Sequence, residues 1–136
     1  MKKKSQVLLF SIVMVFIIVA STVSQAAADT LILKPDVEFS VNTAPVNTPP
    51  WMTATFESVN SNTVRLTMSA DNLSGEEFIS KWFFNFDGNA SSLGFAYVSG
   101  PASSNIYQGE SNNTKADGDG YYDIGFYFPT SSGSRF

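Results

Sequence analysis

The sequence contains no histidine and no cysteine among its 136 residues. Without histidine there is no Ser-His-Asp or Cys-His arrangement for nucleophilic catalysis and no imidazole proton shuttle. Without either residue type, the usual zinc sites are excluded as well. The lack of cysteine excludes disulfides, so stability has to come from a hydrophobic core, a bound ion or association with another molecule. Any catalysis would rest on carboxylates, lysine, tyrosine or serine.

Basic residues are also scarce, and three of the eight lie at positions 2–4. Residues 29–136 contain five lysines and arginines against twelve acids, which gives a net charge of −7. The five are scattered along the chain: Lys34, Arg65, Lys81, Lys115 and Arg135. Because nucleic acids and anionic membranes are bound by clustered lysines and arginines, this pattern argues against both as partners.

The longest apolar run lies near the N-terminus and has the features of an export signal. The lysines at 2–4 precede an apolar stretch at 7–20, and small residues then lead to Ala28. This order predicts a signal peptide over residues 1–28, cut after Ala28 or, alternatively, after Ala26. The stretch is 14 residues long, whereas a spanning helix needs about 20. We therefore expect export machinery and signal peptidase as partners and no membrane association after cleavage, with an uncleaved anchor as the alternative.

Residues 29–50 are expected to form a lead-in before the folded domain. Short strands are predicted at 30–34 and 37–41, and prolines at 45, 49 and 50 then mark a linker. From Trp51 onward, apolar and polar residues alternate. The domain itself is therefore expected over residues 51–136.

Alternation with a period of two is the clearest structural signal in that domain. The runs at 52–57 and 64–69 flank the turn-prone Asn60-Ser61-Asn62, which predicts a β-hairpin with one buried and one solvated face. The aromatic segment 78–86 has large apolar residues on both parities and is predicted to be a central strand. Leu93, Phe95 and Tyr97 predict a further strand.

The remaining residues complete the predicted set of strands. A long polar loop is expected over 99–120, with a short strand at 105–108, and the apolar residues at even positions from 122 to 128 predict the last strand. Short strands separated by turns predict an all-β domain, an antiparallel β-sandwich or jelly-roll-like fold. A sandwich usually has more strands than this pattern provides, so a domain that is incomplete at Phe136 is the alternative.

Several short stretches between residues 49 and 136 carry a likeness to a known family. They are Pro49-Pro50-Trp51, Leu66-Thr67-Met68-Ser69-Ala70 with Asn72-Leu73, Glu76-Glu77-Phe78, Trp82-Phe83-Phe84-Asn85, Lys115-Ala116-Asp117-Gly118-Asp119-Gly120-Tyr121-Tyr122-Asp123-Ile124, and Phe126-x-Phe128-Pro129. In combination, these stretches make the chain resemble exported bacterial domains of PEP-CTERM proteins, which an exosortase sorts.

The resemblance implies a Gram-negative source and an extracellular or surface role, such as a component of biofilm matrix, without an enzymatic activity. Members of the family usually continue into further strands, a Pro-Glu-Pro motif, an apolar helix and a basic tail. The sequence stops at Phe136 without these elements. The expectation is therefore either a truncated sequence or a protein that is simply secreted.

The best candidate for metal chemistry is the segment Asp117-Gly118-Asp119-Gly120 together with Asp123. Carboxylates that alternate with glycine can wrap Ca²⁺, which takes oxygen ligands at about 2.3–2.6 Å. Asp117, Asp119 and Asp123 are therefore the candidate ligands, although the spacing does not meet the EF-hand pattern. The competing interpretation is a tight hairpin turn, because aspartate and glycine both tolerate positive φ.

Two tyrosines are candidates for stacking against glycans. Tyr121 and Tyr127 share the parity that faces outward from the last strand, and large amphipathic rings are common at binding surfaces. Trp82 has the same parity as Phe84 and Phe86, so we expect it in the core instead.

Glu76 and Glu77, with Asp87, are candidates for the carboxylate pair of a glycosidase. Adjacent residues of a strand point to opposite faces, so these two favour a solvated or helix-starting role instead. The sequence as a whole predicts a secreted or cell-surface β domain without catalysis, with extracellular polysaccharide or surface components as partners. Two alternatives stay open: a calcium-assisted carbohydrate-binding module and a carboxylate-dependent glycan-acting enzyme.

Overall fold

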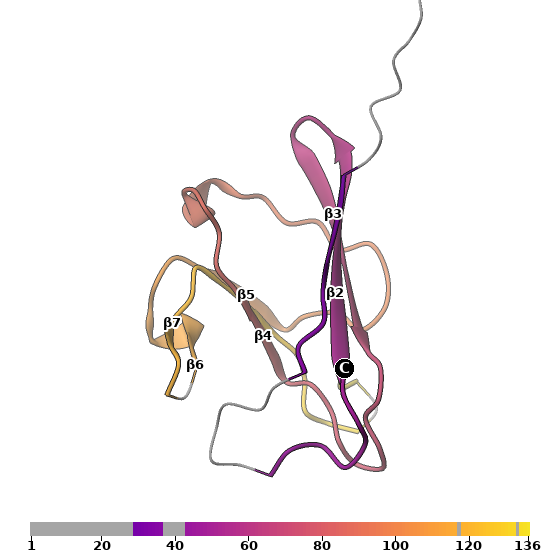
Figure 1. Ribbon diagram of the computed structural model, residues 1–136. Coiled ribbons are helices and arrows are strands. Elements are labelled where there is room, and N and C mark those ends of the chain that lie inside the picture. The colour runs from indigo at the N-terminus through magenta and orange to yellow at the C-terminus, as the bar shows by residue number, and fades with distance from the viewer. Residues whose placement is uncertain (1–28, 37–42, 117, 133) are drawn as a thin grey trace, which may run out of the picture.

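The computed structural model describes residues 29–36, 43–116, 118–132 and 134–136. Within these ranges the regular structure consists of eight β-strands and two short 3-10 helices. The strands form two three-stranded sheets and a two-stranded sheet, all antiparallel (Figure 1). The prediction of an all-β chain is therefore confirmed.

Two of the predictions fall on parts of the chain that the structure does not describe. The signal peptide, residues 1–28, and the short strand at 37–41 both lie outside the described residues. In the ranges that are described, no helix has the length and apolar composition needed to cross a bilayer.

The first sheet consists of β1 (Thr30–Leu33), β2 (Met52–Asn60) and β3 (Thr63–Ala70), in the order β1-β2-β3. Strands β2 and β3 are the predicted hairpin. Asn60 shapes the turn, because its side-chain Oδ1 accepts a hydrogen bond from the backbone N–H of Asn62 at 3.0 Å. The expected hairpin is confirmed, and β1 adds a strand from the lead-in to the same sheet.

Asp71 fastens the open end of the hairpin. Its backbone N–H donates to Trp51 O at 2.9 Å. Its carboxylate accepts hydrogen bonds from the hydroxyl groups of Thr53 on β2 and Ser69 on β3. The two strand ends are therefore tied by one side chain as well as by their ladder.

The second sheet consists of β4 (Lys81–Phe84), β5 (Asn105–Gln108) and β8 (Ile124–Tyr127), in the order β4-β8-β5. The prediction that 78–86 is a central strand is wrong, because β8 occupies the centre. Strand β4 is also shorter than predicted. Before it, Ile79 N donates to Phe136 O at 3.1 Å; after it, Phe86 N donates to the Asp123 carboxylate at 2.8 Å. At both ends of β4, these hydrogen bonds take the place of further strand pairing with β8.

The predicted strand at Leu93, Phe95 and Tyr97 is not formed, since residues 93–98 join no ladder. The start of this segment is held on the 3-10 helix η1 (Ala90–Ser92). Leu93 N donates to Ala90 O, and Leu93 O accepts from the side-chain amide of Gln108. Phe95 contacts the core residue Phe126, but Phe95 and Tyr97 are both exposed, so the alternation of apolar residues here corresponds neither to strand pairing nor to a buried face.

Three further elements fill the connection between β5 and β8. The 3-10 helix η2 (Asn112–Thr114) is followed by the hairpin of β6 (Lys115–Ala116) and β7 (Gly120–Tyr121). Thr114 is fully buried, and its hydroxyl donates to Gly109 O at 2.9 Å. The loop predicted over 99–120 is therefore structured along much of its length.

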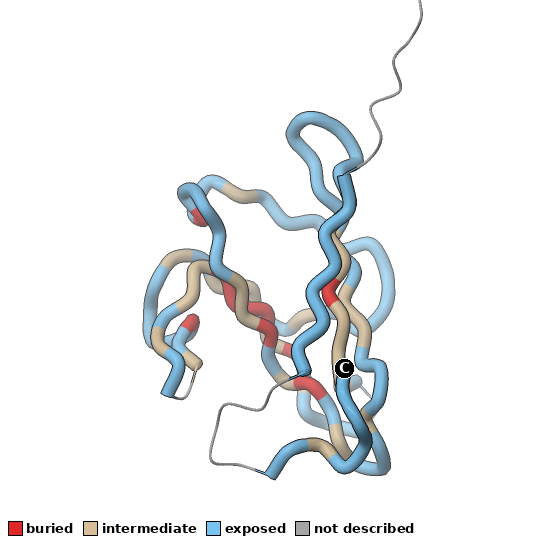
Figure 2. Tube along the Cα trace, in the orientation of Figure 1, coloured by how far each residue is buried: buried red, intermediate tan, exposed pale blue. Residues whose placement is uncertain are grey.

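The hydrophobic core lies where the two larger sheets meet. Figure 2 shows buried positions along the second sheet and further ones on β2 and on the two 3-10 helices. The buried apolar residues are Ala54, Ile79, Trp82, Ala90, Ile124, Phe126 and Phe128. Phe56 of β2 meets Phe84 of β4 edge to face, with ring centroids 5.4 Å apart. The expectation that Trp82 belongs to the core is confirmed, because it is 3% exposed.

Candidate functional site

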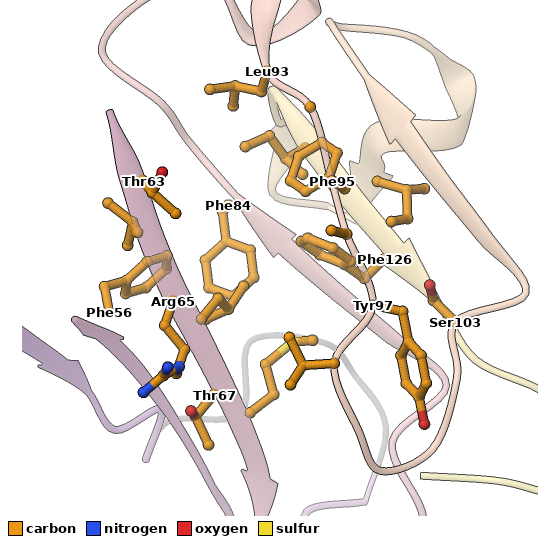
Figure 3. A pocket seen from close by; sticks show the side chains of 18 of the residues that line it. Phe56, Thr63, Arg65, Thr67, Phe84, Leu93, Phe95, Tyr97, Ser103 and Phe126 are labelled. Atoms are coloured by element: carbon orange, nitrogen blue, oxygen red, sulfur yellow. The ribbon is translucent and has the colours of Figure 1, made fainter. Parts of the chain in front are cut away.

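An apolar cleft of about 840 Å³ lies between the two larger sheets (Figure 3). Strands β2 and β3 line one side, and β8 with residues 84–86 and 92–101 lines the other. Three rings meet inside it: Phe126 lies edge-on to Phe95 at 5.4 Å and to Phe84 at 6.1 Å between centroids. The cleft has the size range and aromatic lining typical of ligand sites, which span about 300–1,000 Å³.

The cleft is open because the second sheet covers only part of the apolar face of the first. Residues of alternate parity on β2 and β3 pair across the ladder, Ala54 with Met68 and Phe56 with Leu66. Ala54 is fully buried under the second sheet. Towards the hairpin tip the cover ends, and Val64 of β3 is 59% exposed. Apolar surface is therefore left in contact with water beside β3.

Arg65 is the one charged residue among the described residues that line the cleft. Although Arg65 borders the cleft, it has the parity opposite to Leu66 on β3. Its side chain therefore starts from the face of the sheet opposite to that of Leu66. The nearest acid is Glu57 on β2, with Arg65 Nη1 and Glu57 Oε2 4.0 Å apart. At that separation, and with both side chains exposed, the pair contributes little to stability.

Asp119, one of the candidate metal ligands, lies in a turn in this structure. Gly118 and Gly120 have φ of 78° and 99°, the left-handed region that glycine adopts without strain. Asp119 N donates to Ala116 O at 3.3 Å, closing the hairpin of β6 and β7. Residues 118–120 therefore have the conformation of a tight hairpin turn, as the turn interpretation predicts.

The carboxylates of the candidate ligands have separate hydrogen-bond partners. Asp119 accepts from the hydroxyl of Tyr122 at 2.5 Å, and Asp123 accepts from Phe86 N at 2.8 Å. Asp117 lies outside the described residues. Within the described ranges, no three acidic residues come together in a way that would hold a metal ion. Calcium binding by Asp117, Asp119 and Asp123 stays a prediction.

Tyr122 is the titratable group whose environment is most clearly altered. The hydrogen bond to the Asp119 carboxylate raises the pKa of Tyr122 above its ordinary value of 10.0, and burial and the nearby negative charge add to the effect. The ring stacks on Phe83 of β4, with centroids 5.5 Å apart. The expectation that Tyr122 shares the inward parity of Ile124 is wrong, because Tyr122 precedes β8 and packs on the outer side of the sheet.

The two tyrosines proposed for glycan stacking differ in how accessible they are. Tyr127 is half-buried: its hydroxyl donates to Asn113 O at 2.7 Å, and Lys81 Nζ lies 4.8 Å from its ring centroid. Tyr121 is 47% exposed, with Lys115 Nζ 5.5 Å from its ring. Tyr121 therefore offers an accessible ring, whereas the ring of Tyr127 is largely enclosed.

The acids at 76 and 77 make structural contacts. Glu76 accepts a hydrogen bond from Arg135 Nη2 at 2.6 Å. Glu77 accepts from the backbone N–H groups of Val46 and Ser74, both at 2.8 Å. These bonds hold the turn at residues 74–77 and attach the C-terminal segment to it. Of the two roles expected for these acids, the solvated loop is the one observed for Glu76, whose side chain is 89% exposed, and no helix begins here.

The cleft is the feature that the sequence alone did not indicate. Its walls come from separate segments, with residues from 56–68 on one side and from 84–136 on the other, and no local pattern shows which apolar residues a second sheet will leave uncovered. One signal was present, in that Phe95 and Tyr97 alternate within a segment flanked by glycines. That alternation predicts a strand, whereas in the structure the segment forms one side of a cleft.

Comparison of the chain with protein-family models, with curated proteins and with solved structures gives no match. The resemblance to exported PEP-CTERM domains therefore stays a prediction from the sequence.

Proposed function

We propose that the chain is a secreted or cell-surface β domain that acts by association and not by catalysis, in the extracellular matrix of a Gram-negative bacterium. We also propose that its two larger sheets form the two layers of a β-sandwich. The observation that carries the proposal is the apolar cleft beside β3. Apolar surface that is left open between folded elements is typical of association sites.

The environment of the carboxylates supports a role without catalysis. A general acid or base must be within reach of substrate and able to exchange its proton. Asp71 and Glu77 instead each accept two hydrogen bonds: Asp71 ties the ends of β2 and β3, and Glu77 holds two loop segments through Val46 N and Ser74 N. Asp123 likewise holds the backbone of Phe86. Changing any of them is expected to alter stability first.

The N-terminal sequence supports export. Lysines, an apolar stretch and small residues occur in the order of a cleavable signal. A test is expression of the full chain in a Gram-negative host, with fractionation and mass spectrometry of the N-terminus. The expected product lies outside the cytoplasm and begins at Asp29, or at Ala27 if the alternative cut is used. A variant with arginine at both 26 and 28 should stay unprocessed.

The outcome that would contradict export is a full-length chain that remains in the cytoplasm. Association is tested on the exported chain by its retention in extracellular matrix after washing. Release of fragments from labelled polysaccharide would contradict the absence of catalysis. Retention without release of fragments is the expected result.

Calcium-assisted carbohydrate binding is the second candidate, and the exposed ring of Tyr121 is the observation that favours it. Affinity electrophoresis with a panel of soluble polysaccharides, with and without Ca²⁺, tests this function. Retardation that depends on Ca²⁺ and is lost in Tyr121→Ala would support it. Unchanged migration across the panel would reject it and leave the association role in place.

A further inference from the structure

Strand β3 has a free edge along all of its eight residues, Thr63–Ala70. It is the last strand of its sheet, paired with β2 on one side and with no strand among the described residues on the other. A free edge presents a row of backbone N–H and C=O groups that can pair with another chain. At about 3.3 Å per residue, this edge offers room for a segment of similar length.

The edge of β3 borders the cleft, and the other sheet edges do not combine the same features. Leu66 and Met68 turn towards the cleft from β3 and line it. Strand β1 has four residues, and none of them lines the cleft. Strands β4 and β5, the two edges of the second sheet, also have four residues each, and each contributes one residue to the cleft, Phe84 and Ile106. Among these edges, that of β3 therefore offers an added strand both the longest row of backbone hydrogen-bonding groups and an apolar cleft for its side chains.

A strand that pairs with β3 would meet two different environments. Side chains of one parity would enter the cleft, facing the rings of Phe84, Phe95 and Phe126 across it. Side chains of the other parity would lie on the outer face, next to Arg65 and Thr67. Because the Arg65 side chain is 59% exposed and its Nη1 lies 4.0 Å from Glu57 Oε2, the guanidinium can take an acidic neighbour from the added strand. Opposite charges on adjacent strands are favourable.

We propose that the β3 edge and the cleft bind an extended segment of another polypeptide, which adds to the sheet as a fourth strand next to β3. The segment has apolar residues at alternate positions, which fill the cleft, and an acidic residue beside Arg65. Backbone pairing supplies affinity and the cleft supplies selectivity, as in other cases of strand addition. The inference rests on the proposed association role and names the partner of the cleft.

The test uses the exported chain and designed, fluorescently labelled eight-residue peptides in anisotropy titrations. The first peptide alternates valine or phenylalanine with threonine, and has glutamate at the position expected beside Arg65. A second peptide has lysine in place of glutamate, and a third has the composition of the first with the alternation scrambled. We expect the scrambled peptide to bind at least about tenfold more weakly than the first, and the lysine peptide about fivefold more weakly.

Charge reversal at the edge provides a variant that leaves the core intact. Arg65→Glu should reverse the preference between the glutamate and lysine peptides. Lys34→Glu, which makes the same charge change on an exposed residue outside the cleft, should leave the preference unchanged. Amide shifts of the labelled protein should change along β3 and not along β1 or β5. Circular dichroism confirms that each variant is folded.

Four results would overturn the proposal. Equal binding of the alternating and scrambled peptides would reject strand addition. A dimer in sedimentation that Arg65→Glu dissociates would assign the cleft to a second copy of the chain. Slow amide exchange along the β3 edge in the chain alone would show that the chain covers it itself. Absence of binding by all three peptides, in a chain that is exported and retained in matrix, would reject this inference and leave the proposed association role in place.

Discussion

The ring of Phe83 lies against the backbone of Gly125, its cross-strand partner in β8. A Cβ at position 125 would stand 3.1 Å from Phe83 Cε1 and 3.3 Å from Asn113 O. The ring is held in place by Tyr122 and Tyr127, with centroids 5.5 and 6.1 Å away. The glycine in the central strand therefore makes room for a layer of aromatic rings on the outer face of the sheet.

Gly125→Ala should destabilise the fold by about 1–3 kcal/mol, because the added methyl group overpacks a site with little freedom to move. Chemical denaturation followed by circular dichroism measures the change. Gly94→Ala is the matched control, since no atom lies within 4 Å of its Cβ position, and it should change stability by less than about 0.5 kcal/mol. Equal effects of the two substitutions would contradict the packing of Phe83 on Gly125.

Trp82→Phe should cost less than its burial suggests. The indole Nε1–H of Trp82 is buried without a hydrogen-bond acceptor in the described part of the chain, and such a group carries a penalty of about 1–3 kcal/mol. Phenylalanine loses some apolar contact but removes this penalty, so we expect a net change within about 1.5 kcal/mol. Phe126→Ala, which truncates a buried ring, should cost about 3–5 kcal/mol. A similar loss in both variants would show that the indole has an acceptor.

Asp123→Ala should destabilise the protein by about 1–2 kcal/mol, because Phe86 N would lose its acceptor. The effect should be the same with and without millimolar Ca²⁺, measured by thermal melting. Asp119→Ala, at an exposed turn, should have a smaller effect. If Ca²⁺ raised the melting temperature and Asp123→Ala abolished the increase, the calcium hypothesis would be supported and the turn interpretation would be insufficient.

The free energy of unfolding should fall at alkaline pH, because the Tyr122 hydroxyl loses its proton. Its pKa is raised in the folded state, first by the hydrogen bond to Asp119 and then by burial. Between the ordinary and the raised pKa, the unfolded chain releases a proton that the folded chain keeps, so this contribution is complete below about pH 10 and is lost as pH rises through the folded value. Ultraviolet absorbance of tyrosinate measures the titration of the tyrosines. A late component, titrating at higher pH than ordinary tyrosines, should be present in the wild type and absent in Tyr122→Phe.

Asp119→Asn should move that component towards ordinary tyrosine behaviour, because the charged acceptor is removed. Circular dichroism at each pH keeps the comparison within the folded state. A wild-type titration with no late component, or one that Asp119→Asn leaves unchanged, would contradict the hydrogen bond between Tyr122 and Asp119.

Local patterns predicted the hairpin of β2 and β3, the short strand β5 and the last strand β8. In β2, β3 and β8 apolar and polar residues alternate, and in the hairpin of β2 and β3 the turn residue Asn60 reinforces this signal. The pattern also placed Trp82 in the core and Tyr127 on the opposite side of the sheet from Phe126. These features depend on residues that are neighbours in sequence.

Features that depend on distant partners were not predicted. The aromatic density of 78–86 did not show that β8, over forty residues later, would take the central position. Leu93, Phe95 and Tyr97 have the alternation of a strand, but their segment is held by Gln108 and η1 instead. The cleft likewise results from the incomplete overlap of two sheets, which no single segment encodes.

Amide hydrogen exchange on the exported chain without any ligand tests the architecture most directly. The slowest amides should be those of Ile124–Tyr127, which lie between two strands, because buried ladders open only with global unfolding. The outward-facing amides of β3 and those of residues 93–98 should exchange fast. Protection along β3 or 93–98 that equals the protection of β8 would contradict an open cleft with a free edge.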